Sequence, residues 1–160
     1  MFGLSLVQFT YLHVFLSLVG IAAGLFVVFG LLTSRRLSIL TSLFLVTTVL
    51  TSLTGFLFPF HGVTPGIIVG ILSIIALALA IVALYVKKLD GSWRGTYVIS
   101  VLVAFYFNVF VLIAQSFEKV PALKSVAPTM TSPGWGFSQA AVLVIFLLLT
   151  VRAFKKFHLS

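Results

Sequence analysis

Five long runs of apolar residues constrain this chain more than any other feature of its sequence. A helix needs about 20 apolar residues to cross the hydrocarbon core of a bilayer, which is roughly 30 Å thick. Only 8% of the 160 residues are charged, whereas soluble domains carry about 25%. We therefore predict an all-α integral membrane protein, with residues 1–160 forming a single transmembrane domain and one five-helix bundle. The predicted spans cover approximately residues 7–32, 38–58, 65–86, 96–116 and 136–154.

The basic residues predict how this bundle is oriented. Ten Lys and Arg residues face only two acidic residues, which gives a formal net charge of +8. With five crossings, Lys119 and Lys124 lie on one side of the membrane. The positive-inside rule then places the N-terminus outside and the C-terminus in the cytoplasm, in a multi-pass protein of the plasma (inner) membrane. The other eight basic residues share the cytoplasmic side: Arg35, Arg36, Lys87, Lys88, Arg94, Arg152, Lys155 and Lys156.

Several function classes do not fit the sequence. Nucleic-acid binding calls for a basic face with exposed aromatic residues or a known motif, and the chain shows neither. Without cysteine there is no thiolate metal site or cysteine nucleophile. The only carboxylates, Asp90 and Glu118, fall on opposite sides of the predicted membrane, and no motif typical of a catalytic site is present. We therefore predict that the chain is not an enzyme.

Two connections are predicted on the outer side. The first, "TGFLFPFHGVTPG" (residues 54–66), contains His61 and ends where Pro65 is expected to begin the third helix. Proline suits that position because its fixed φ matches a helix and its missing amide proton is not needed there. The second connection is a long outer loop over approximately residues 117–135. Loops of this length are often functional, so it is either a lid or a passive flap.

Small and polar residues predict which helix faces look inward. His13, Ser17, Gly20 and Gly24 follow one another at steps of three or four, so they share one face of the first helix. Small residues mark the faces at which membrane helices pack closely. Asn108 and Gln115 share a face of the fourth run. We expect these two residues to face the bundle, because an unsatisfied amide in hydrocarbon is costly.

The polar side chains gather near the predicted outer surface. Ionisable groups inside a membrane are candidates for function, and His13 is the only one that lies within a span away from its ends. Asn108 lies nearer the middle of its span, and the remaining candidates lie at or beside the outer ends of theirs. The predicted ligand-binding residues are therefore His13, His61, Asn108, Gln115 and Glu118.

Three functions remain open. The first is a small accessory or structural subunit without a cofactor, which acts within the lipid bilayer by contact with another membrane protein or with copies of itself. The second is a component that binds a quinone, a lipid or a b-type haem through His13 and His61, which would be the ligands of a haem or metal. The third is a small transporter, although no acidic residue lies inside any span, and relays of protons or cations usually need one.

Overall fold

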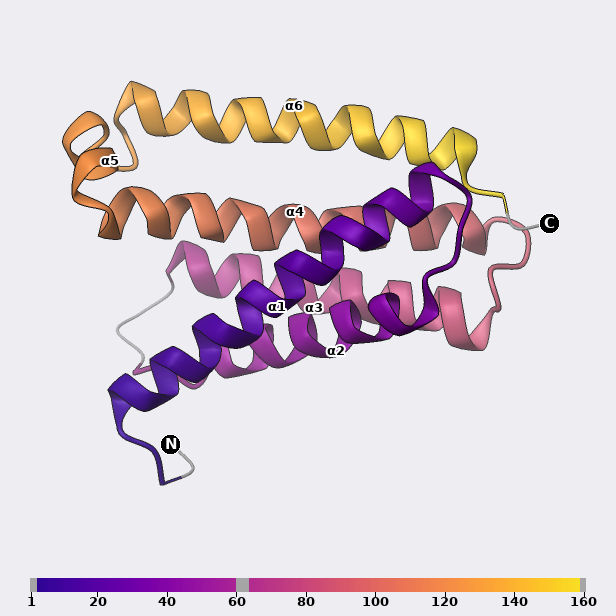
Figure 1. Cartoon of the computed structure of the whole chain (residues 1–160), viewed down its shortest axis with the longest axis horizontal. Helices are drawn as coiled ribbons and strands as arrows, with labels where there is room; N and C mark the ends of the chain where they lie inside the picture. The colour runs from indigo at the N-terminus through magenta and orange to yellow at the C-terminus, as the bar shows by residue number, and fades with distance from the viewer. Residues whose placement is uncertain (1–2, 60–63, 159–160) are drawn as a thin grey trace.

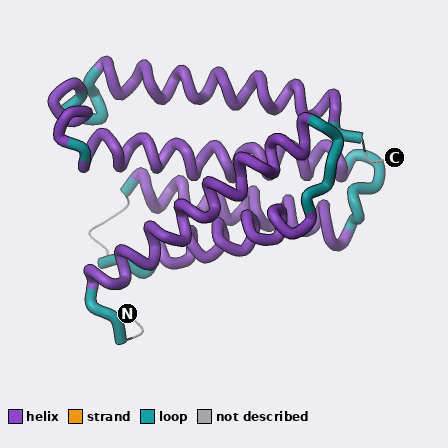
Figure 2. Tube along the Cα trace, viewed as in Figure 1, coloured by secondary structure: helices purple, strands orange, loops and turns teal. Residues whose placement is uncertain are grey.

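A computed structural model of the chain describes residues 3–59 and 64–158. Within these residues all regular structure is helical, and five segments are long and apolar enough to cross a membrane. Successive long helices run up and down, with their connections at the two ends of the bundle (Figures 1 and 2). The elements are α1 (Leu6–Leu32), α2 (Ser38–Gly55), α3 (Pro65–Ile81) continued by the π-helical turn η1 (Val82–Val86), α4 (Trp93–Lys119), the short α5 (Pro121–Val126) and α6 (Pro133–Lys156).

The helix ends follow from local chemistry. The Ser5 hydroxyl accepts from the Gln8 amide at 3.3 Å and the Gln8 side chain accepts from the Ser5 amide at 3.0 Å, which caps the start of α1 reciprocally. Pro65 begins α3 as predicted. The second span was predicted to reach residue 58, but α2 ends at Gly55. The chain tightens there because the Phe56 amide bonds to the carbonyl of Leu53 at 3.2 Å, three residues earlier.

The prediction of a long loop over residues 117–135 is wrong. α4 continues to Lys119, and α5 begins directly at Pro121. The proline was interpreted as a loop residue, whereas proline at the first position of a helix is favourable. Val120 before it is extended, with φ −89° and ψ 114°, as the residue before a proline usually is. Only a short connection therefore separates α5 from α6.

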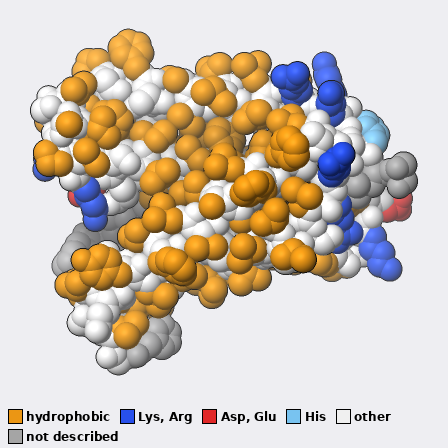
Figure 3. Space-filling model, in the orientation of Figure 1, with side chains coloured by type: hydrophobic (Ala, Val, Ile, Leu, Met, Phe, Trp, Pro, Cys, Tyr) orange, Lys and Arg blue, Asp and Glu red, His pale blue; other side chains and the backbone are white. Residues whose placement is uncertain are grey.

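The two ends of the bundle differ in charge. Lys and Arg side chains gather at the end where the described C-terminus lies, which we call the basic end, and apolar side chains cover the length of the helices on the face shown in Figure 3. At the basic end Arg94 donates hydrogen bonds to the carbonyls of Phe154 and Phe157. A cation at this position stabilises the C-terminus of α6.

The core is centred on α4, which contacts α1, α3 and α6. The Phe105 ring lies edge-on to Phe44 at 6.0 Å and tilted against Phe146 at 5.4 Å, so one aromatic side chain joins α2, α4 and α6. Tyr97 and Ser100, nearer the start of α4, are buried. α6 is the least buried of the five long helices, as its uniformly apolar sequence predicted.

Candidate functional site

Two glycines allow α1 to pack closely on its neighbours, Gly20 against α2 and Gly24 against α4. A Cβ atom added to Gly24 would lie 2.5 Å from the Phe105 ring, and one added to Gly20 would lie 3.1 Å from the Thr47 hydroxyl. The predicted small-residue face of α1 is therefore confirmed as a packing face. From this crossing, α1 and α4 diverge toward the end of the bundle opposite the basic end (Figure 1).

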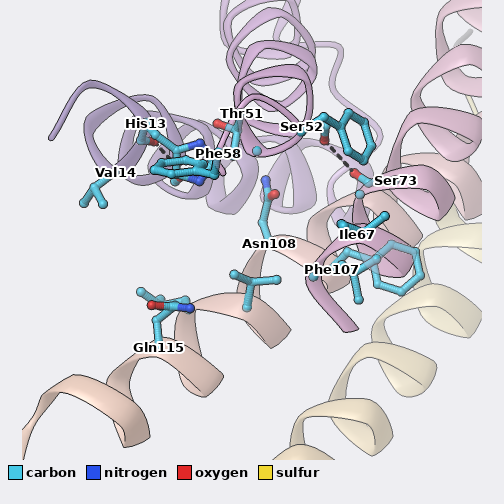
Figure 4. Close-up of a pocket in the computed structure, with 18 of the residues that line it drawn as sticks. His13, Val14, Thr51, Ser52, Phe58, Ile67, Ser73, Phe107, Asn108 and Gln115 are labelled. Carbon is cyan, nitrogen blue, oxygen red and sulfur yellow. Dashed lines mark hydrogen bonds between the residues drawn. The ribbon is translucent and has the colours of Figure 1, made fainter. Parts of the chain in front are cut away.

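A cavity of about 470 Å³ fills the space where the helices diverge. Its walls come from α1, α2, α3 and α4 with the turn after α2, and we call it the four-helix cavity. Its volume falls in the range of roughly 300–1,000 Å³ that is typical of small-molecule sites. Several of its side chains are drawn in Figure 4. The polar and charged side chains that line it are Thr10, His13, Ser17, Thr51, Ser52, Thr64, Ser73, Asn108, Gln115 and Lys119.

His13 is held firmly in the wall of this cavity. Its Nδ1 atom lies 2.8 Å from the hydroxyl oxygen of Thr54 on α2. The Phe58 ring meets the imidazole edge-on at a centroid distance of 5.2 Å. Gly55 also lies close, because a Cβ atom there would come within 3.6 Å of His13 Cε1. Contacts on several sides thus fix the ring.

Asn108 and Gln115 differ in their surroundings. The Asn108 amide donates to the Thr48 hydroxyl at 3.1 Å, so this half-buried side chain faces the bundle as predicted. Gln115 lines the cavity two turns further along the same face of α4 but is exposed. It faces the interior of the bundle as predicted, but it is exposed because α1 has diverged from α4 at this level.

Hydroxyl groups on α2 and α3 complete the cavity, and sequence reasoning did not select them. Thr51 Oγ1 is buried and has no hydrogen-bond partner among the described residues. The Ser52 hydroxyl donates to that of Ser73 at 3.4 Å. Serine and threonine are common at contacts between membrane helices, so their presence alone does not indicate a ligand site. The available signal was that Ser73 belongs to the small-residue stripe of the third span, which must face a neighbouring helix.

Glu118 belongs to a different cavity. A second hollow of about 530 Å³ lies between the start of α3, the end of α4 and residues 124–135. We call it the α5 cavity, and Glu118 and Lys124 line it. Gln115 lines both cavities, whereas Glu118 does not line the four-helix cavity. The predicted cluster of five residues is thus divided: His13, Asn108 and Gln115 share one cavity, and Glu118 lies in the next.

The predicted haem or metal ligands are only partly covered by the structure. His61 lies outside the described residues, so its relation to His13 is not defined. Within residues 3–59 and 64–158, no three His, Asp or Glu side chains come together as a group that could hold a metal ion. The described residue with imidazole chemistry in the four-helix cavity is His13.

Comparison with known proteins returns no relative. No protein-family model matches the chain, and neither curated proteins nor solved structures give a match. Function is therefore inferred from the four-helix cavity and its chemistry.

Proposed function

We propose that this chain is a small multi-pass membrane protein that binds an amphiphilic small molecule, such as a quinone or a lipid, in the four-helix cavity. The observation that carries the proposal is a largely apolar hollow of about 470 Å³ that includes a few polar side chains. That combination is typical of ligand sites between the helices of a bundle. It favours the ligand-binding hypothesis over a purely structural role, which does not require a cavity.

The exposed rim supports entry of the ligand from the lipid layer. Val14 and Leu18 of α1 are 43% and 50% exposed, and Leu112 of α4 is 37% exposed. All three line the cavity. This opening is bordered by apolar side chains on two diverging helices, so it would face the hydrocarbon layer of the membrane. A molecule dissolved in the hydrocarbon layer would reach it without crossing the headgroups.

The lining chemistry supports an amphiphile with a ring or a hydroxylated head. Phe56, Phe58 and Phe107 offer aromatic surfaces, on which a flat head can stack or meet an edge. His13 and Ser17 add polar atoms from α1. The aliphatic rim leaves a path along which a tail extends into lipid.

The charge distribution supports an outer location for this site. If the basic end is cytoplasmic, as the positive-inside rule requires, the four-helix cavity lies in the outer half of the membrane. Binding, rather than catalysis, is supported by the cavity lining, because it contains no carboxylate and His13 is its one imidazole among the described residues. An amphiphile bound there would serve a partner protein or a sensing role without being converted.

The experiment is identification of the lipophilic molecules that copurify with the protein. The protein would be isolated in a mild detergent, extracted with organic solvent and analysed by mass spectrometry. In Leu18→Trp the indole would obstruct the rim. Leu25→Trp is the matched control, because Leu25 is also exposed on α1, at 60%, two turns away and outside the cavity lining.

We expect one lipophilic species to be retained by the unmodified protein and by Leu25→Trp, and to be lost or strongly reduced in Leu18→Trp. Retention of that species at the same level in both variants would exclude the four-helix cavity as its site. If only bulk membrane lipid is recovered, in equal amounts from all three proteins, the proposed function is wrong.

A further inference from the structure

We infer that the ligand of the four-helix cavity presents a hydroxyl group that donates a hydrogen bond to His13 Nε2. The site would therefore select a phenol, quinol or alcohol head over the corresponding quinone, ketone or ether. This inference rests on the proposed function, since it names the chemical class of the ligand in that same site. It follows from how the hydrogen-bond donors around His13 are already used.

The Thr54 hydroxyl determines which nitrogen of the neutral imidazole carries the proton. Its oxygen lies 2.7 Å from the Leu50 carbonyl oxygen and 2.8 Å from His13 Nδ1. Two oxygens at 2.7 Å need a proton between them, and only the threonine can supply it. A hydroxyl has a single proton, so Thr54 must accept from Nδ1–H. In that tautomer Nε2 carries a lone pair and is a hydrogen-bond acceptor.

Nε2 is the ring nitrogen available to a ligand. Among the described residues no group forms a hydrogen bond with it, and the imidazole lines the cavity. The ring cannot turn over to exchange its nitrogens without breaking the bond to Thr54. Phe58 at its edge and Gly55 beside Cε1 also limit its rotation. The orientation that presents an acceptor is therefore maintained.

The hydroxyl groups next to His13 cannot donate hydrogen bonds to a ligand. Thr10, Ser17 and Thr54 each donate to a carbonyl oxygen one turn earlier in the same helix, at 2.7–2.8 Å. Their protons are thus used, and their oxygens present only lone pairs. The lining side chains that keep a proton to donate lie on other parts of the wall, and they are Thr51, Thr64, Ser73, Asn108, Gln115 and Lys119. A ligand carbonyl placed against His13, Ser17 and Thr54 would therefore meet lone pairs.

The test compares two probes that differ in a single hydrogen-bond donor, 4-decylphenol and 4-decylanisole. Both have the same ring and tail, but the methyl ether has no proton to donate. Their dissociation constants would be measured by isothermal titration with the full-length protein in lipid nanodiscs. We expect the phenol to bind about tenfold more tightly, the ratio that one hydrogen bond of ordinary strength provides.

Two variants identify the group responsible. In His13→Phe a ring remains but the acceptor is lost, so both probes should bind with similar affinity. In Thr54→Val, which guards against a folding defect in the first variant, Nε2 remains but the tautomer is no longer imposed, so the preference should shrink. His158→Phe, which changes a histidine outside the cavity lining at the basic end, should leave the tenfold ratio unchanged.

The outcomes separate this inference from the proposed function. Equal affinity for the two probes in the unmodified protein, or tighter binding of the ether, would overturn the inference while leaving an amphiphile site in place. A preference for the phenol that persists in His13→Phe would also overturn it. Failure of both probes to bind would overturn the proposed function as well.

Discussion

The close crossing of α1 and α4 gives a sharp quantitative prediction. Gly24→Ala would place a Cβ atom 2.5 Å from Cδ2 and 2.7 Å from Cε2 of Phe105. Ordinary contacts between carbon atoms begin near 3.5 Å, so a displacement of about 1 Å is needed. Phe105 is only 2% exposed and is held between the rings of Phe44 and Phe146. The helices, rather than the ring, must therefore move.

The expected cost follows from two opposing effects. Overpacking of a well-packed core costs typically 1–3 kcal/mol, and a fixed ring places this site at about 3 kcal/mol. Replacing glycine with alanine inside a helix returns about 1 kcal/mol. We expect Gly24→Ala to lower the free energy of unfolding by about 2 kcal/mol, measured by titration from mild detergent into SDS and monitored by circular dichroism.

Gly95→Ala is the matched control. A Cβ atom on Gly95 would also lie 2.5 Å from a phenylalanine ring, that of Phe154. Phe154 is 42% exposed, so its ring can swing aside, and we expect Gly95→Ala to leave the stability unchanged or raise it by up to about 1 kcal/mol. Equal effects of the two alanines would refute the assignment of Gly24 to a close helix crossing. Phe105→Leu in the Gly24→Ala background should recover part of the loss, because neighbouring sites in contact are coupled by roughly 0.5–3 kcal/mol.

Four further predictions concern other parts of the molecule. Thr51→Val removes a buried hydroxyl without a partner among the described residues, so the ligand-free protein should gain up to about 1 kcal/mol in the same titration; a loss would show that the hydroxyl is bonded. Phe157→Ala empties a fully buried position and should cost about 3–5 kcal/mol, with a smaller loss arguing against a packed basic end. Because the chain has no cysteine, Ser125→Cys should react with an impermeant maleimide in intact cells and Ser92→Cys only after permeabilisation; the reverse pattern would invert the proposed orientation. The visible spectrum of the purified protein should show no Soret band, whereas a band that disappears in His13→Ala would establish the haem alternative.

Most of the fold could be predicted because the apolar runs and the prolines carry the information locally. Pro65 begins α3 as its fixed φ predicted, and the first span ends at the predicted residue. The two errors at helix ends concern residues whose preference depends on their neighbours. Gly55 ends α2, although the apolar run continues beyond it. Pro121 begins α5, and in isolation the same residue is equally typical of a turn.

The candidate site was predicted less completely, because sequence gives the depth of a residue but not the angle between two helices. His13 and Asn108 were placed on inward faces, and their bonds to Thr54 and Thr48 confirm this. Gln115 was placed on the same face of α4 but is exposed, since the divergence of α1 cannot be read from either helix alone. Glu118 has a similar depth but lines the α5 cavity.

The crossing of α1 over α4 is the structural cause of the four-helix cavity. The helices α1 and α4 touch at Gly24 and cross at an angle, so they separate on either side of that point. Toward the basic end α1 contacts α6. On the other side no further long helix is present among the described residues, and the space that opens is the four-helix cavity. His13 and Ser17 lie on this diverging part of α1. Nδ1 of His13 is bonded to Thr54 and the Ser17 hydroxyl to the His13 carbonyl, which leaves His13 Nε2 as the ring nitrogen that a bound polar group would satisfy. A variant that straightens this crossing, with α1 parallel to α4, should therefore lose ligand and stability together, whereas a packing role alone would lead to a gain in stability as the cavity closes.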